Sequence, residues 1–354
     1  MNKVNRTAPS VKSRDSIVAG TLCGLPIILF FVSLFLGRFS VDPLTVPQVL
    51  AAAALESIPN FPLSIPHTWP DVVDTVILKV RFPRVIAALL IGTGLAVSGA
   101  SFQGLFRNPL VSPHILGVAS GAGFGAALGI ILSGETWVIQ TFAFSFGVLA
   151  VGLTYTLAKI YKTTPTLVLV LAGIVVGSFF SALISLLKYM ADPYEKLPAI
   201  VFWLMGSLSS VKAGDLMFLL VPIVLGTTVL LLIRWRINVL AMGEDEARTL
   251  GVDTARMARA IILCATLITA TAVCFSGVIG WVGLVVPHIA RMIVGPDYRK
   301  LLPLSAAIGA SYLLIIDDLA RTLTAAEIPL GILTAIIGAP VFAWLLKTKK
   351  VGWS

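Results

Sequence analysis

The stretch Gly92–Gly117, GTGLAVSGASFQGLFRNPLVSPHILG, decides the fold of this chain. Small residues recur through its apolar first half: Gly92, Gly94, Ala96, Ser98, Gly99 and Ala100. At three- and four-residue spacing they let helix backbones approach closely inside lipid. A polar turn, Arg107-Asn108-Pro109, follows before the chain becomes apolar again at Ile115. Such a turn is costly at membrane depth unless it lies at an interface or lines a cavity, so we interpret the stretch as a packed helix leading into an elbow of a pore.

The composition places the chain among polytopic membrane proteins. Of its 354 residues, 57% are hydrophobic and 12% are charged, and the mean hydropathy is +0.97. A soluble domain carries about 25% charged residues, roughly twice as many. No long hydrophilic stretch remains for a soluble catalytic domain. We therefore expect an all-α protein with one membrane domain.

The first apolar run, from Ile17 to Leu36, follows four basic residues. It is long enough to cross a bilayer core of ~30 Å, and no Ala-x-Ala cleavage site follows it. We expect it to remain in the protein as the first membrane helix, after a tail of residues 1–16. The three cysteines lie in apolar segments and fit neither a disulfide framework nor a metal-site spacing.

Ten apolar runs can cross the membrane. Their expected ranges are 17–37, 84–106, 114–133, 137–158, 166–188, 213–234, 258–276, 281–294, 302–320 and 328–346. An even number of crossings puts both termini on one side. On this arrangement 18 of the 26 lysines and arginines fall on the side of the termini and 8 on the other.

The positive-inside rule then predicts that both termini are cytoplasmic. The membrane domain covers residues 17–347, and residues 348–354 form a cytoplasmic tail. The net charge of +9 reflects this bias, and nucleic-acid binding is not needed to explain it.

Two connections between the spans are long. The outer segment 38–80 contains six prolines, so we expect turns with one short helix around Val46–Ser57. The inner segment 237–257 is the extended charged stretch on the cytoplasmic side. Within it, three acids from Glu244 to Glu246 and a glycine at Gly251 predict a short helix. Its small apolar face, Ala247 and Leu250, suits docking on a partner, although a solvated loop would have the same spacing.

Basic residues mark the outer ends of two spans. Arg81 and Arg84, in Arg81-Phe82-Pro83-Arg84, lie three residues apart, and Pro83 suits the first turn of a helix. Arg321 adds a third outer cation, which Asp317, Asp318 or Glu327 could partly neutralise. Two interpretations remain open: interfacial snorkelling, common for arginines at helix ends, and a docking surface for an acidic partner.

The segment Gly277–Arg291, GVIGWVGLVVPHIAR, breaks a long apolar run with three glycines. It predicts a tight re-entry between adjacent spans. His288 is far in sequence from His67 and His114, so a structural histidine is favoured over a metal ligand, and we expect no metal site.

Catalytic motifs are missing from the sequence. Gly-Lys occurs nowhere, so the phosphate-binding loop G-x-x-x-x-G-K-[ST] is absent, and so is H-E-x-x-H. A proton-coupled transporter usually carries buried carboxylates in its spans, and here only Asp317 and Asp318 lie near the end of one. The pattern favours a passage driven by another component over an enzyme or a stand-alone secondary transporter.

In this order, several motifs resemble the membrane permease of type II ABC importers, the uptake family for iron chelates, haem and vitamin B12. The matching segments are RFPR at 81–84, GLAVSGASFQGLFRNPLVSPHILG at 94–117, LAG at 171–173, WLMGSL at 203–208, MGEDEARTLG at 242–251, GVIGWVGLVVPHIAR at 277–291 and DDLARTLTAAEIPLGILTAIIGAPVFAWLL at 317–346. The resemblance covers roughly residues 17–347.

The resemblance implies a homodimer of ten-helix subunits in the cell (inner) membrane. Two ATP-binding subunits would lie below it and a periplasmic or lipid-anchored substrate-binding protein above. The permease itself would bind no cofactor, because ATP and Mg²⁺ are used by the partner ATPase. The implied cargo is an iron chelate (siderophore or haem) or cobalamin, with molybdate or tungstate oxyanions as the alternative.

The resemblance also assigns residues to roles. Those for docking of the binding protein are Arg81, Arg84 and Arg321. Those for coupling to the ATPase are Val239, Leu240, Gly243, Glu244, Ala247, Leu250 and Gly251. Those for a cytoplasmic gate are Asn108, Leu110 and Thr166, the last anchored only by its distance from Leu171-Ala172-Gly173.

Overall fold

The computed structural model describes residues 11–56, 65–160 and 166–348, and within them every regular element is helical. The helices are α1 (Val11–Phe35), α2 (Thr45–Glu56), α3 (Asp71–Asp74), η1 (Thr75–Arg81), α4 (Phe82–Phe106), α5 (Val118–Leu132), α6 (Thr136–Lys159), α7 (Thr166–Met190), α8 (Lys196–Met205), η2 (Ala213–Asp215), α9 (Leu216–Leu232), α10 (Arg234–Met242), α11 (Glu244–Thr249), α12 (Thr254–Ser276), α13 (Val282–Val294), α14 (Tyr298–Thr322) and α15 (Leu330–Thr348). The expected all-α class is therefore confirmed.

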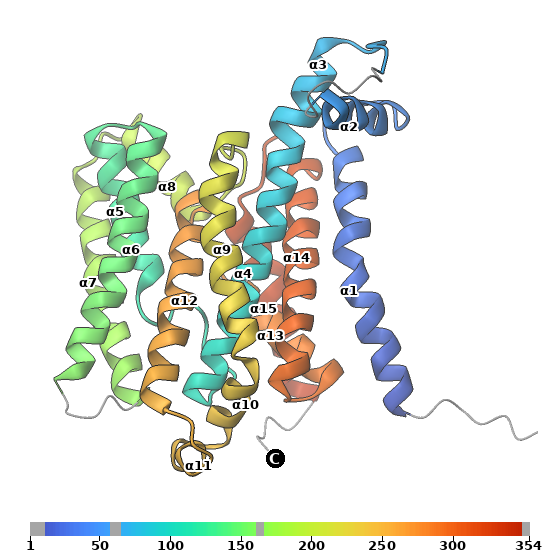
Figure 1. Ribbon diagram of the computed structural model, residues 1–354. Helices are drawn as coiled ribbons and strands as arrows, with labels where there is room; N and C mark the ends of the chain where they lie inside the picture. The colour runs from blue at the N-terminus through green and yellow to red at the C-terminus, as the bar shows by residue number, and fades with distance from the viewer. Residues whose placement is uncertain (1–10, 57–64, 161–165, 349–354) are drawn as a thin grey trace, which may run out of the picture.

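The long helices run side by side between two ends of one bundle (Figure 1). We call the end that carries α2 and α3 the upper end, and the end that carries α10 and α11 the lower end. The helices α5–α7 form one flank and α1 the other, while α4 runs through the middle. Both α1 and α15 have their chain-terminal ends at the lower end, as an even number of crossings requires.

Six helical stretches of the described residues are long and apolar enough to cross a membrane, and five shorter apolar helices accompany them. Four of the shorter ones coincide with expected spans, which together with the six long stretches gives the ten crossings expected from the sequence. The fifth, α8, was not expected. It has only ten residues, so it is too short to cross. Parts of the expected tails (residues 1–10 and 349–354) lie outside the described residues, and the remaining residues 11–16 and Thr348 are helical.

The helix α4 is the centre of the bundle because its small residues admit neighbouring backbones. It packs against α14, α12, α13 and α9. A Cβ atom added to Gly92 would lie below 3.0 Å from the backbone of Gly309 in α14, and one added to Gly99 would meet Gly283 of α13 equally closely. Gly92 and Gly99 are seven residues apart, so the close approach expected from the sequence takes place along one face of α4, where α14 and α13 pack at successive levels.

One part of the expected outer loop is helical instead. Residues 71–81 continue directly into α4, so a single helical stretch runs from Asp71 to Phe106. Pro83 therefore lies inside a continuous helix and not at its start. The turns before it are π-helical over Thr75–Arg81, and the N–H of Phe82 bonds to the carbonyl of Ile77, five residues back. This wider turn accommodates a proline that lacks its own N–H.

Two loops adopt left-handed backbone conformations. Arg107, at the C-terminus of α4, has φ 50°, and its N–H bonds to the carbonyl of Gly104. Trp281 has φ 68° where α12 gives way to α13, and its side chain packs on Gly338 of α15. The break around Gly277, with φ 67°, forms the tight re-entry expected between these spans.

Candidate functional site

A buried ion network holds the upper end of the bundle together. Arg84 of α4 donates from Nε to both carboxylate oxygens of Asp317 in α14, at 2.9 and 3.0 Å. Its Nη1 and Nη2 atoms donate to the two oxygens of Glu327, at 3.0 and 2.8 Å. Asp317 is fully buried and Arg84 nearly so. One guanidinium thus pairs with two carboxylates, in the forked geometry that makes arginine pairs strong.

The other two arginines fasten the end of α1. Arg321 pairs with Asp318 of the same helix, donates to the hydroxyl of Ser33 at 2.9 Å and bonds to the carbonyl of Leu36 at 2.9 Å. Arg81 donates to the carbonyl of Leu34 at 2.8 Å. The last carbonyls of a helix have no hydrogen-bond donors within the helix, and the N–H groups of these two guanidiniums serve as their donors.

These contacts bear on the expected docking surface. Arg81, Arg84 and Arg321 are all buried, and all have hydrogen-bond partners inside the chain. Arg81 and Arg84 have different partners, the Leu34 carbonyl and the Asp317 carboxylate. Neutralisation of Arg321 by Asp317 and Asp318 is present, whereas Glu327 pairs with Arg84. The docking role of the three arginines stays a prediction.

Glu327 also connects the network to the segment after α8. Its Oε1 atom accepts a hydrogen bond from the Ser207 hydroxyl at 2.9 Å, and the Ser207 N–H donates to the carbonyl of Ser276 at 2.9 Å. Burial alone would raise the pKa of Glu327, but the hydrogen bonds and charge of Arg84 outweigh it and lower the pKa below the usual value. The carboxylate is therefore held ionised between α4 and the α8 segment.

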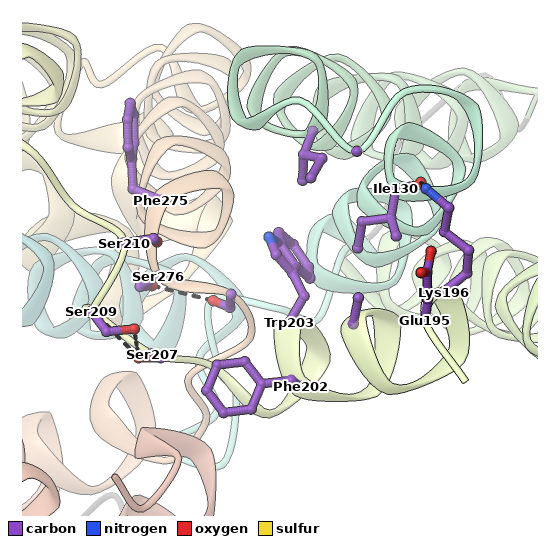
Figure 2. Close-up of a pocket in the computed structure, with 14 residues that line it drawn as sticks. Ile130, Glu195, Lys196, Phe202, Trp203, Ser207, Ser209, Ser210, Phe275 and Ser276 are labelled. Carbon is purple, nitrogen blue, oxygen red and sulfur yellow. Dashed lines mark hydrogen bonds between the residues drawn. The ribbon is translucent and has the colours of Figure 1, made fainter. Parts of the chain in front are cut away.

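A cavity of about 340 Å³ opens beside Ser207 (Figure 2). Trp203 and Phe202 of α8, Phe275 of α12 and Ile130 of α5 give it an aromatic and aliphatic wall. The hydroxyls of Ser207, Ser209 and Ser210 line one side, and Glu195 and Lys196 lie at the far side. The Lys196 ammonium is already bonded to the carbonyl of Ile130 at 3.0 Å. The cavity is thus largely neutral, with hydroxyl groups on one wall.

At the lower end, α10 and α11 form the tip of the molecule (Figure 1). The short helix expected after Gly243 is confirmed as α11, and Gly251 follows it with φ 77°. Ala247 is fully buried within the chain, so the expectation that it belongs to an exposed apolar face is wrong. Leu250 is 59% exposed, and it is joined by Met242, 65% exposed, which the sequence reading had not singled out as apolar surface.

The remaining coupling residues divide between packing and surface. Val239 and Leu240 are buried residues of α10, and Gly243 connects α10 to α11. Glu244 is exposed and pairs with Arg248 at 2.8 Å, one helical turn away. Whether any of these residues contacts a partner stays a prediction.

The expected gate residues lie in two places at the lower end. Asn108 and Leu110 belong to the turn after α4, where the Asn108 side chain accepts a hydrogen bond from the Leu110 N–H at 2.9 Å. Both are exposed, Leu110 by 52%. Thr166 is the first described residue of α7. No hydrogen bond between described residues joins Thr166 to that turn.

Sequence reasoning missed Ser207 and the link that Glu327 makes. The motif WLMGSL contains Ser207, but its partner is 120 residues away, so no local spacing could reveal the pair. Arg84 and Asp317 are 233 residues apart.

Taken together, a ten-crossing helical bundle, a fastened upper end and a projecting helical tip define a membrane permease. The sequence profile described as the FecCD transport family matches residues 25–348. The chain belongs to the FecCD transport family and is a permease subunit of an ABC importer.

Several known proteins are similar over most of their length. The molybdate import system permease protein MolB of Haemophilus influenzae is 42% identical over 336 residues, covering 94% of this chain and 96% of MolB. The cobalamin import system permease protein BtuC of Halobacterium salinarum is 41% identical, covering 80% and 76%. A solved structure described as an inward-facing conformation of a putative metal-chelate type ABC transporter has a TM-score of 0.81 and 40% identity, covering 94% of this chain and all of that one.

Proposed function

We propose that this permease forms the path by which an iron chelate, a siderophore or haem, or cobalamin crosses the membrane. The observation that carries the proposal is the family match over residues 25–348, together with relatives named for cobalamin, iron chelatin and hemin transport. The aromatic wall of the cavity beside α8 agrees with a cargo that has an organic ligand shell, because apolar and aromatic side chains line most sites for such molecules.

A molybdate or tungstate oxyanion is the second candidate. The relative MolB, named for molybdate, matches 94% of this chain. Hydroxyl groups at Ser209 and Ser210 could donate hydrogen bonds to such an anion, whereas the Ser207 hydroxyl already donates to Glu327. Against it, the one lysine at the cavity is bonded to a carbonyl, and Glu195 lies beside it.

The assembly that we propose is a homodimer in the cell (inner) membrane. Two ATP-binding subunits lie below it and a substrate-binding protein above, and the partner ATPase uses ATP and Mg²⁺. The lower end faces the cytoplasm, because most lysines and arginines belong to that side. Exposed apolar residues of α7, such as Leu171 and Val175, are available for the dimer contact or for lipid.

The docking and gate roles fit this orientation. The upper end receives the binding protein, and Arg81, Arg84 and Arg321 retain the docking role implied by the resemblance. Because all three are bound internally, contact with the partner would require their network to open. Asn108, Leu110 and Thr166 form the cytoplasmic gate, and closure of the ATPase subunits switches the bundle between two packings.

Coupling to the ATPase depends on the tip formed by α10 and α11. We expect the exposed side chains of Met242 and Leu250 to enter a groove of the ATP-binding subunit, while buried Ala247 keeps the tip folded. The double change Met242→Ser and Leu250→Ser should weaken ATPase binding at least tenfold, since two buried apolar side chains are worth about 1.5–3 kcal/mol each. Co-purification and titration with the ATP-binding subunit measure this.

The matched control is Leu263→Ser, because Leu263 is 69% exposed but lies on α12 away from the tip. It should leave ATPase binding unchanged. Normal ATPase binding by the double variant would contradict the coupling role of the tip.

The function itself is tested by reconstitution. Proteoliposomes that contain the permease, its ATP-binding partner and its binding protein should accumulate one of four radiolabelled cargoes: ferric siderophore, haem, cobalamin or molybdate. Uptake should require ATP and vanish when the ATP-binding subunit is left out. Uptake by the permease alone would contradict the proposal and indicate a stand-alone secondary transporter, and accumulation of molybdate only would select the second candidate.

A further inference from the structure

A histidine and two aspartates converge at the upper end, where the chain enters the α3 helix. The Nε2 atom of His67 lies 2.8 Å from Asp74 Oδ2 and 3.9 Å from Asp71 Oδ1. One donor atom from each of the three side chains lies within 4.8 Å of the other two. Among the described residues, no lysine or arginine pairs with either carboxylate, and His67 is the only basic side chain beside them. The cluster thus brings one nitrogen and two oxygen donors together with an excess of negative charge.

Trp69 contacts two members of this cluster, Asp74 and His67, and restricts their orientation. Its ring is buried, and its Nε1 donates to Asp74 Oδ1 at 2.7 Å. The His67 ring lies against the Trp69 ring, with centroids 4.9 Å apart. Asp74 therefore has one oxygen held by the indole and the other turned to His67. In metal sites, partners of this kind orient the ligands and raise affinity.

The distances suit a small divalent ion after a minor movement. Two donors each ~2.0–2.2 Å from such an ion, in tetrahedral or octahedral geometry, are ~3.0–3.5 Å apart. The two distances from His67 bracket this range. Asp71 has a fully exposed side chain, so it can rotate inward without disturbing any packing.

The donor types select the metal. Imidazole with carboxylates suits first-row transition metals such as Zn²⁺, Mn²⁺ or Fe²⁺, whereas Ca²⁺ and Mg²⁺ prefer oxygen donors alone. The side chain of His67 is 47% exposed and that of Asp71 is fully exposed. A metal ion therefore has access to the cluster from solvent, and water molecules can fill the remaining coordination positions of the ion.

We propose that His67, Asp71 and Asp74 bind one divalent first-row transition metal ion at the upper end, with Trp69 as a positioning residue. The site would tie the segment before α3 to the first turns of the long helix that continues into α4. It contrasts with the sequence expectation of no metal site, and it does not depend on which cargo the importer carries.

Binding is measured on the full-length permease, purified with a histidine-free tag and stripped with EDTA. Calorimetry with Zn²⁺ should give one site per chain. Co²⁺ should give a visible absorption band whose intensity reports the coordination number, and Zn²⁺ should displace it. Ca²⁺ in excess should not.

Variants separate ligands from their surroundings. His67→Ala and Asp71→Asn should abolish the cobalt band, and the second changes only a fully exposed side chain, so loss of folding cannot explain its effect. Trp69→Phe keeps an aromatic ring but removes the N–H donor, and should weaken binding about 10–100-fold with the stoichiometry unchanged. The control is Glu56→Gln, an exposed acid of α2 outside the cluster, which should bind like the unmodified chain. Absence of zinc binding by the unmodified chain, or unchanged binding by His67→Ala, would overturn the proposal.

Discussion

Replacing Gly99 by alanine should leave little folded permease. The new methyl group would lie below 3.0 Å from backbone atoms of Gly283, and backbone cannot rotate away as a side chain can. Overpacking costs about 1–3 kcal/mol where side chains can yield, and here α4 and α13 must separate along their contact. We expect a fall of at least 3 kcal/mol in stability, at the upper limit of that range. Fluorescence-detected size-exclusion chromatography and thermal melting in detergent measure it.

Gly152→Ala is the matched control. Gly152 lies in α6 with no atom within 4 Å of an added Cβ. Alanine favours a helix over glycine by about 1 kcal/mol, so this variant should melt at the same temperature or higher. Equal melting temperatures for Gly99→Ala and Gly152→Ala would show that the backbones of α4 and α13 do not touch.

Replacing Arg84 by methionine should be the most damaging change of a charged residue. It leaves Asp317, which is fully buried, without its bidentate partner and frees Glu327 from its strongest contact. Breaking a buried pair by removing one member costs about 3–5 kcal/mol, because an uncompensated charge stays inside. We expect a large drop in the melting temperature and in the yield of monodisperse protein.

Two further variants test the cause. Arg248→Met breaks an ion pair of the same 2.8 Å length with Glu244, but both side chains are more than half exposed, so about 0–1 kcal/mol should be lost. Arg84→Met combined with Asp317→Asn and Glu327→Gln removes all three charges and should recover part of the lost stability. If the triple variant were no more stable than Arg84→Met, unpaired charge would not be the reason for the loss.

How far the fold follows from the sequence depends on the range of the interactions. Small residues along α4 predict close packing because their spacing is local, and the acids before Ala247 predict α11 for the same reason. Nothing local predicts that Arg84 meets Asp317, because folding brings together residues 233 positions apart. The helical turns before Pro83 were not predicted, because proline usually marks the first turn of a helix, whereas here the wider π-helical turns allow the helix to begin before it.

The same difference between local and long-range interactions holds for the residues of the candidate site. The tip at α10 and α11 could be found from its charge pattern, but which side chains are exposed could not. Ala247 was expected at the surface and is buried, whereas Met242 is exposed. The cluster at His67 is local in sequence, with Asp71 and Asp74 four and seven residues on. The spacing of a histidine and two acids does not by itself reveal that their donor atoms lie within 4.8 Å of one another.

The backbone contacts of α4 limit how the bundle can change shape. Where Gly92 meets Gly309 and Gly99 meets Gly283, no layer of side chains separates the helices, so neither pair can slide without a clash. We expect α4, α13 and α14 to behave as a stationary frame. Any transport cycle would then have to place its motion outside this frame, for example in α7 and α9, whose apolar stretches are only 33% and 28% buried.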